Sequence, residues 1–196
     1  LIPRPETEHL IEHALEWLKV EEPRRPKPLL ADIGTGSGAI AIAGAVHCPH
    51  SRWIATDISP DALDTARRNA ERHGVAGRIE FRLGSLLEPI IEPLDAILSN
   101  PPYVPDGDRE GMQPDVAEWE PAGALFSGPD GLDCIRQLVT DAPGWLESGG
   151  LLALECGIGQ ADAIIGLMNE TGALEACRAH EDLAGIPRVV EARRKA

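Results

Sequence analysis

Asn100, Pro101, Pro102 and Tyr103 are the residues of this chain with the clearest potential for chemistry. They follow an apolar run, residues 94–99, that is typical of a buried strand. The prolines lack backbone N–H donors, and Asn100 is driven into an extended conformation by the proline after it. The Asn100 side-chain oxygen and the Pro101 carbonyl can then accept both hydrogens of a planar NH2 group, with the Tyr103 ring against its face. Such a site suits chemistry on an amide nitrogen or an exocyclic base amine; the alternative is a plain proline turn.

A glycine turn, Gly34–Gly38, lies upstream between an apolar strand, residues 29–33, and a helix, residues 39–47. Its glycines permit positive φ and let the backbone approach a ligand closely. The helix that follows offers unpaired N–H groups at its first turn. Ala39 stands where the dinucleotide fingerprint has its third glycine, which argues against NAD.

The next predicted strand, residues 52–57, ends in an acid, Asp57. A carboxylate at this place can accept hydrogen bonds from both ribose hydroxyls of a nucleoside ligand; the alternative is an acid that only leads into the next helix. The glycine turn, Asp57 and Asn100 each follow the carboxyl end of a strand, and open parallel sheets bind ligands at that edge. The combination is much more specific than any of its parts.

With these features the sequence resembles class I S-adenosylmethionine-dependent methyltransferases that act on amino groups. Residues 1–8, Leu-Ile-Pro-Arg-Pro-Glu-Thr-Glu, narrow the resemblance to the HemK/PrmC family. Members of that family methylate the side-chain amide (N5) of the glutamine in the Gly-Gly-Gln motif of peptide-chain release factors. Further matching stretches extend over nearly the whole chain: Glu120-Pro121, Ala124-Leu125, Gly128–Leu132, Gly149-Gly150, Glu155, Asp182–Gly185 and Arg188–Val190.

The resemblance implies S-adenosylmethionine as cofactor and S-adenosylhomocysteine as product. The residues expected to contact the cofactor are Asp32, Gly34, Thr35, Gly36, Ser37, Gly38, Asp57, Ile58, Ser85, Leu86 and Asn100. Asp32 would hold the ammonium group through ordered water, or else cap the glycine turn, and Ile58 would pack on the adenine. Ser85 and Leu86 stand where the family has an acid or an aromatic residue beside the adenine.

The resemblance also assigns a substrate site, with Asn100, Pro101 and Tyr103 as its catalytic residues. Pro102 and Arg4 complete the residues expected to contact the substrate, although Arg4 equally fits an exposed ion pair. An amide nitrogen is a poor nucleophile because its lone pair is delocalised into the carbonyl. The expected mechanism is therefore orientation and electrostatic stabilisation rather than acid–base catalysis.

Composition indicates one α/β domain, since the chain has 196 residues and is 43% hydrophobic. The net charge of −14 opposes attraction to nucleic-acid phosphates. No apolar run approaches the ~20 residues of a membrane span. The four cysteines form no CxxC pair, so no metal site is expected, and reduced thiols fit a cytoplasmic protein.

The expected fold is a Rossmann-like, mostly parallel seven-stranded sheet with helices on both faces and a C-terminal antiparallel hairpin. Residues 1–28 are expected to be a helix and linker that join a missing N-terminal substrate-binding domain, and residues 29–196 the catalytic domain. Helices are expected at residues 6–20, 39–47, 60–73, 132–145 and 160–171. Strands are expected at residues 29–33, 52–57, 79–83, 94–99, 151–156, 174–180 and 188–192.

The long segment Pro105–Asp130 is expected to be a substrate-facing lid, and Ser148–Gly150 a turn. The partner implied is a release factor, with no direct contact to nucleic acid or membrane, and we expect a monomer. Three alternatives remain open at this point: a glutamine methyltransferase of a ribosomal protein, an N6-adenine methyltransferase of nucleic acid, and a non-catalytic scaffold that binds S-adenosylmethionine.

Overall fold

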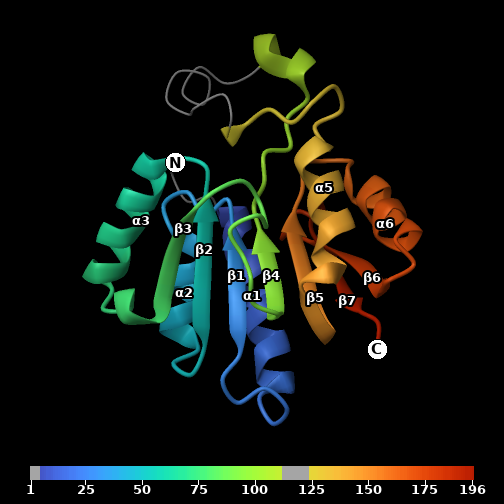
Figure 1. Cartoon of the computed structure of the whole chain (residues 1–196). Coiled ribbons are helices and arrows are strands. Elements are labelled where there is room, and N and C mark those ends of the chain that lie inside the picture. The colour runs from blue at the N-terminus through green and yellow to red at the C-terminus, as the bar shows by residue number, and fades with distance from the viewer. Residues whose placement is uncertain (1–4, 112–123) are drawn as a thin grey trace.

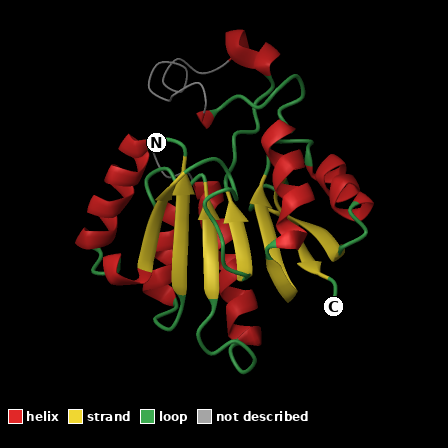
Figure 2. Cartoon of the chain, in the orientation of Figure 1, coloured by secondary structure: helices red, strands yellow, loops and turns green. Residues whose placement is uncertain are grey.

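The computed structural model describes residues 5–111 and 124–196, and these form a seven-stranded sheet with helices on both faces (Figures 1 and 2). The strand order is β3-β2-β1-β4-β5-β7-β6. The strands are β1 Leu29–Ile33, β2 Arg52–Asp57, β3 Ile79–Leu83, β4 Leu94–Ser99, β5 Leu146–Glu155, β6 Leu174–Glu181 and β7 Pro187–Arg194. The helices are α1 Pro5–Glu21, α2 Ala39–His47, α3 Pro60–Arg72, α5 Asp133–Asp141 and α6 Ala161–Glu170, with 3-10 turns at Ala76–Arg78, Asp106–Gly111 and Ala142–Gly144.

The first five strands pair in parallel, and β7 pairs antiparallel with both β5 and β6. The expected mostly parallel sheet with a C-terminal antiparallel hairpin is therefore confirmed. The hairpin does not simply extend the sheet outward, because β7 lies between β5 and β6.

Alternate residues of each central strand belong to two different cores. Leu30 and Leu98 pack with residues of α1 and α2 on one face. Ala31 and Ile97 pack with residues of α5 and α6 on the other face, in keeping with the two-residue period of a strand. In the view of Figure 1, α5 stands in front of the sheet and α1 and α2 stand behind it. Both faces of the central strands β1 and β4 are thus buried, which explains their nearly continuous apolar sequences.

The start of α3 is encoded locally. The Ser59 side chain accepts a hydrogen bond from the Ala62 backbone N–H at 3.2 Å, and Pro60 occupies the first turn. Proline is preorganised for that position, where its missing N–H has no intrahelical partner to lose. The helix start predicted from the sequence, at residue 60, is confirmed.

Two sequence predictions about residues 132–156 are wrong in detail. The predicted helix 132–145 ends at Asp141 and continues only as the 3-10 turn Ala142–Gly144, because Pro143 has no N–H with which to continue an α-helix. The predicted turn Ser148–Gly150 lies inside β5, which begins at Leu146. Gly149 has a φ of 73° there, and the pairing of β4 with β5 shifts register at this place.

None of the helices within the described ranges is both long and apolar enough to cross a bilayer.

Helix α2 packs closely against the sheet where Gly44 faces Trp53 of β2. A Cβ atom on Gly44 would stand 2.0 Å from the ring of Trp53, whose side chain is buried. The Trp53 indole N–H donates to the Ser51 hydroxyl at 2.9 Å, which fixes the ring in place. The ring therefore has little freedom to move away from a larger residue.

We predict that Gly44→Ala lowers the free energy of unfolding by about 1–3 kcal/mol through overpacking. The control is Gly166→Ala in α6, where an added Cβ meets nothing within 4 Å; better helix propensity should stabilise it by up to about 1 kcal/mol. Urea unfolding of both variants checks the pair, and equal effects would contradict the packing argument.

Candidate functional site

The parallel register brings three sequence features to one edge of the sheet. Ile33 of β1 is in register with Thr56 of β2 and with Ser99 of β4. The residues that follow these positions therefore emerge side by side at the carboxyl ends of the strands. The Ser99 hydroxyl donates to the Ile33 carbonyl at 2.7 Å and ties the ends of β1 and β4 together.

The glycine turn uses the conformational freedom of its glycines. Gly34, Gly36 and Gly38 have φ values of 70°, 56° and 86°, a backbone region that residues with a side chain rarely adopt. A Cβ at Gly34 would meet nothing within 4 Å, whereas one at Gly38 would stand 2.9 Å from Ile42 and 3.1 Å from Ala66. Gly34 thus leaves open space at the strand edge, while Gly38 lets α2 and α3 pack closely.

The Asp57 carboxylate holds the turn from the neighbouring strand. Its Oδ2 accepts from the Gly36 backbone N–H at 2.9 Å, and its Oδ1 accepts from the Ser59 backbone N–H at 2.9 Å. One carboxylate therefore fixes both the glycine turn and the approach to α3. A carboxylate has about four lone-pair sites, so each oxygen can accept a further hydrogen bond.

Asp32 is completely buried beneath the turn. Its Oδ2 accepts from the Thr35 hydroxyl at 2.6 Å and from the Ala41 backbone N–H at 3.0 Å. Its Oδ1 has no hydrogen-bond partner among the described residues. Burial raises the pKa of Asp32 to about 6, against the lowering effect of the two hydrogen bonds. The bond from Thr35 has the geometry of a cap on the turn, and the second oxygen is left for another donor.

The segment Asn100–Tyr103 follows the end of β4 and is held by contacts with neighbouring residues. Pro101 is buried, and Asn100, Pro102 and Tyr103 are half-buried. The Tyr103 hydroxyl lies 3.4 Å from Oε1 of Glu155, a buried acid at the end of β5. This contact holds the tyrosine ring at its hydroxyl end.

Sequence reasoning missed the residue that fixes the backbone of this segment, Gln160. Its Nε2 donates to the Tyr103 carbonyl at 2.9 Å and to the Asp130 carbonyl at 3.2 Å, while its Oε1 accepts from the Gly157 N–H at 2.9 Å. Gly131 allows the close approach, since a Cβ there would stand 2.2 Å from the Tyr103 carbonyl oxygen. A glutamine just before a helix carries no signal of this contact, because its partners come from distant parts of the chain.

The expected adenine neighbours lie beside Asp57. Ile58 is 65% exposed, an unusual state for an isoleucine. Ser85 and Leu86 follow β3 and are half-buried, and the Leu86 carbonyl accepts from the Thr56 hydroxyl at 3.0 Å. Leu86 has a φ of 46°. The same edge thus gathers these three residues with the glycine turn; Ser37 contributes its carbonyl, which accepts from the Asn69 amide at 2.9 Å.

The expected lid is described only at its two ends. The Val104 N–H donates to the Leu125 carbonyl at 2.9 Å, and the Ser127 N–H donates to the Val104 carbonyl at 3.0 Å. The two ends of the segment therefore run together directly after Tyr103. Arg4 and residues 112–123 lie outside the described residues.

Residues 12–115 match the family model described as the methyltransferase small domain. Among solved structures, a ribosomal protein L11 methylase from Lactobacillus delbrueckii subsp. bulgaricus has a TM-score of 0.67 at 20% identity, over 98% of this chain and 81% of that one. An RNA methyltransferase from Salinibacter ruber, in complex with S-adenosyl-L-homocysteine, has a TM-score of 0.60 at 22% identity, over 99% and 94%. The fold is that of a class I methyltransferase.

Two curated relatives are release factor glutamine methyltransferases. The one from Geobacter sulfurreducens is 45% identical over 195 residues, 98% of this chain and 65% of its own length. The one from Moorella thermoacetica is 44% identical over 196 residues, 100% of this chain and 68% of its own length. The chain belongs to the release factor glutamine methyltransferase (HemK/PrmC) family and spans about two thirds of the length of these relatives.

The raised pKa of Asp32 gives a prediction for stability against pH. A folded-state pKa of about 6 against an ordinary 3.8 means that the folded protein binds more protons in this window. Stability therefore falls as pH rises from about 4 to about 6, by roughly 3 kcal/mol for this group. Asp32→Asn should lack that loss, so its stability relative to wild type should rise across the window. Urea unfolding at a series of pH values tests this, and parallel curves for the two proteins would refute it.

Proposed function

We propose that this protein transfers a methyl group from S-adenosylmethionine to the side-chain amide nitrogen of the glutamine in the Gly-Gly-Gln motif of peptide-chain release factors. The observation that carries the proposal is the position of the Asn100–Tyr103 segment at the end of β4, beside the glycine turn of β1. Family membership supports the same reaction.

The cofactor fits the residues at the strand edge. Gly34 leaves open space for the methionine part, and the free oxygen of buried Asp32 suits an ammonium group, either directly or through water. Asp57 keeps lone pairs for the ribose hydroxyls while it holds the turn. Exposed Ile58 provides an apolar surface for the adenine. When bound, the cofactor supplies an electrophilic methyl group on a sulfonium.

Four further residues complete the cofactor site that we propose. Ser85 and Leu86 flank the adenine from the end of β3, and Thr35 and Ser37 contribute through the backbone of the turn. The ionised form of Asp32, which burial disfavours, would be favoured again by the positive charge of the ammonium group. Binding of the cofactor would thus offset the cost of burying the ionised Asp32 carboxylate.

The substrate amide is handled by the Asn100–Tyr103 segment in this proposal. The Asn100 side-chain oxygen and the Pro101 carbonyl accept the two N–H groups, so the nitrogen is oriented and positive charge that develops on it is stabilised. The Tyr103 ring packs on the glutamine side chain, and its contact with Glu155 holds the ring. Gln160 fixes the carbonyl of Tyr103 and so positions the segment.

The same proposal includes a protein partner, a cellular compartment and an oligomeric state. Arg4, Pro102 and the segment Pro105–Asp130 would contact the release factor. The net charge of −14 disfavours a nucleic-acid substrate. The four free cysteines fit a reducing compartment, and we place the reaction in the cytoplasm, carried out by a monomer.

The direct test is methyl transfer from labelled S-adenosylmethionine to a purified release factor. We expect labelling of the factor, none of its Gly-Gly-Gln variant with Gln→Ala, and none of adenine-containing oligonucleotides or of ribosomal proteins. Labelling of the oligonucleotides would favour an N6-adenine methyltransferase, and labelling of a ribosomal protein would favour the related glutamine enzyme. Cofactor binding without any transfer would favour a scaffold.

A second test asks whether Asn100 acts on the substrate or binds the cofactor. Asn100→Ala should lower the rate of methyl transfer by roughly 100-fold, as for loss of one oriented polar group, with cofactor affinity nearly unchanged. Asn169→Ala, at an exposed position in α6, is the matched control and should behave as wild type. Calorimetric titration with S-adenosylhomocysteine measures the binding. Equal losses of binding and transfer would mean that Asn100 serves the cofactor instead.

A further inference from the structure

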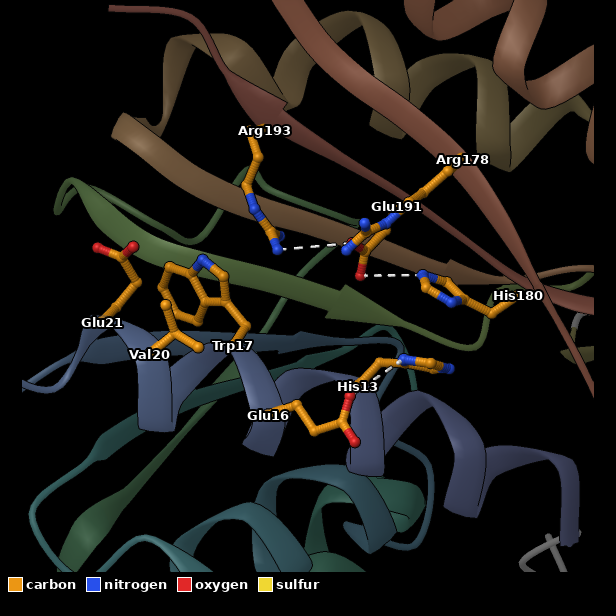
Figure 3. Close-up of a pocket in the computed structure, with 9 residues that line it drawn as sticks. All are labelled: His13, Glu16, Trp17, Val20, Glu21, Arg178, His180, Glu191 and Arg193. Atoms are coloured by element: carbon orange, nitrogen blue, oxygen red, sulfur yellow. Dashed lines mark hydrogen bonds and ion pairs between the residues drawn. The ribbon is translucent and has the colours of Figure 1, made fainter.

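A pocket of about 490 Å³ lies between α1 and the antiparallel strands β6 and β7. Figure 3 shows its lining, in which side chains of α1 face side chains of the two strands. It shares no lining residue with the strand-edge site described above. Its lining combines the apolar side chains of Trp17 and Val20 with charged side chains: Glu16, Glu21, Glu191, Arg178 and Arg193.

Three side chains of types that serve as metal ligands lie close together in this pocket. His13 of α1, His180 of β6 and Glu191 of β7 each offer a ligand atom, and these atoms lie within 4.8 Å of one another. The two imidazole rings have their centroids 3.7 Å apart, with an interplanar angle of 33°. Each imidazole carries its lone pair in the plane of its ring, so the two stacked rings bind one ion together once one of them turns toward it.

The contact between His180 and Glu191 has a length that suits metal ligands better than a hydrogen bond. His180 Nε2 lies 3.4 Å from Glu191 Oε2. It is buried and has no hydrogen-bond partner among the described residues. Two atoms bound to a tetrahedral zinc ion, each about 2.0–2.1 Å from the metal, are themselves about 3.4 Å apart. The pair is thus already spaced as one edge of a tetrahedral site.

Two neighbouring arginines hold the Glu191 carboxylate in place. Arg178 Nε donates to Glu191 Oε1 at 2.8 Å, and Arg193 Nη2 lies 3.5 Å from the same oxygen. The arginines therefore occupy Oε1 and leave Oε2 directed at His180. Glu16 Oε2 lies 4.0 Å from His13 Nδ1, so a second carboxylate stands next to the cluster.

We propose that His13, His180 and Glu191 form a site for a zinc-class divalent cation, with a fourth position open to the pocket. Two imidazoles and one carboxylate are a ligand set that zinc uses when it keeps one position open. This site is separate from the proposed methyl transfer. A bound ion would join α1 to the C-terminal strands, so its expected effect is on the stability of the chain.

The test is titration of Zn²⁺ into the metal-free chain, followed by calorimetry and by thermal unfolding. We expect one ion per chain and a rise in melting temperature. His13→Ala and His180→Ala should each weaken binding by more than about 10-fold. His50→Ala, at an exposed position away from the pocket, is the matched control and should bind as wild type. Circular dichroism of each metal-free variant verifies its fold.

Cobalt substitution tests the ligand set independently of any variant. The four free cysteines are rival ligands for zinc. The absorption spectrum of the Co²⁺-loaded chain should show tetrahedral bands without the charge-transfer band of a thiolate ligand. A thiolate band, the absence of stoichiometric binding, or full binding in both histidine variants would each overturn the proposal. None of these measurements depends on methyl transfer, so the proposed function stands or falls separately.

Discussion

The candidate site depends on the hydrogen bonds that the Asp57 carboxylate makes to its own loop and to the glycine turn of the neighbouring strand. Gly36 lies in a turn, outside any helix, and its backbone N–H donates to the Asp57 carboxylate at the end of the neighbouring strand β2. The same carboxylate orients Ser59, which in turn caps α3. A single acidic side chain therefore couples the shape of the ligand-facing turn to the start of a helix. The parallel register of the strands makes this possible, because it places the end of β2 beside the turn.

Much of this architecture could be predicted from the sequence because its signals are local. Apolar runs bounded by glycine, proline or acidic residues identified β1 to β4 with the bounds that the structure has. The predicted start of α3 at residue 60 is also correct, because a serine followed by a proline is a local signal of a helix start. The errors in residues 132–156 have one origin. A glycine pair indicates a turn when it is considered alone, but here Gly149 and Gly150 lie in a register shift inside β5, between Leu146 and Leu151, which both pair with β4.

The rest could not be predicted because it depends on contacts between distant parts of the chain. Gln160 has its function only once the loop after β4 and the start of α6 lie side by side. The cluster of His13, His180 and Glu191 exists only because α1 crosses the C-terminal strands; in the sequence, these are an ordinary helix histidine and two polar strand residues. No period or motif signals such a group, and the expectation of no metal site followed from cysteine spacing alone.

The position of β7 inside the sheet sets the order in which the strands can pair during synthesis. β5 is complete at Glu155, yet its outer neighbour in the sheet begins only at Pro187. β6 leaves the ribosome earlier but belongs at the rim, where it pairs with β7 and not with β5. During synthesis the nascent sheet therefore keeps an open edge on β5, a surface prone to pairing with other chains. The sheet beyond β5 can form only after β7 has emerged, because β6 pairs with β7 and not with β5.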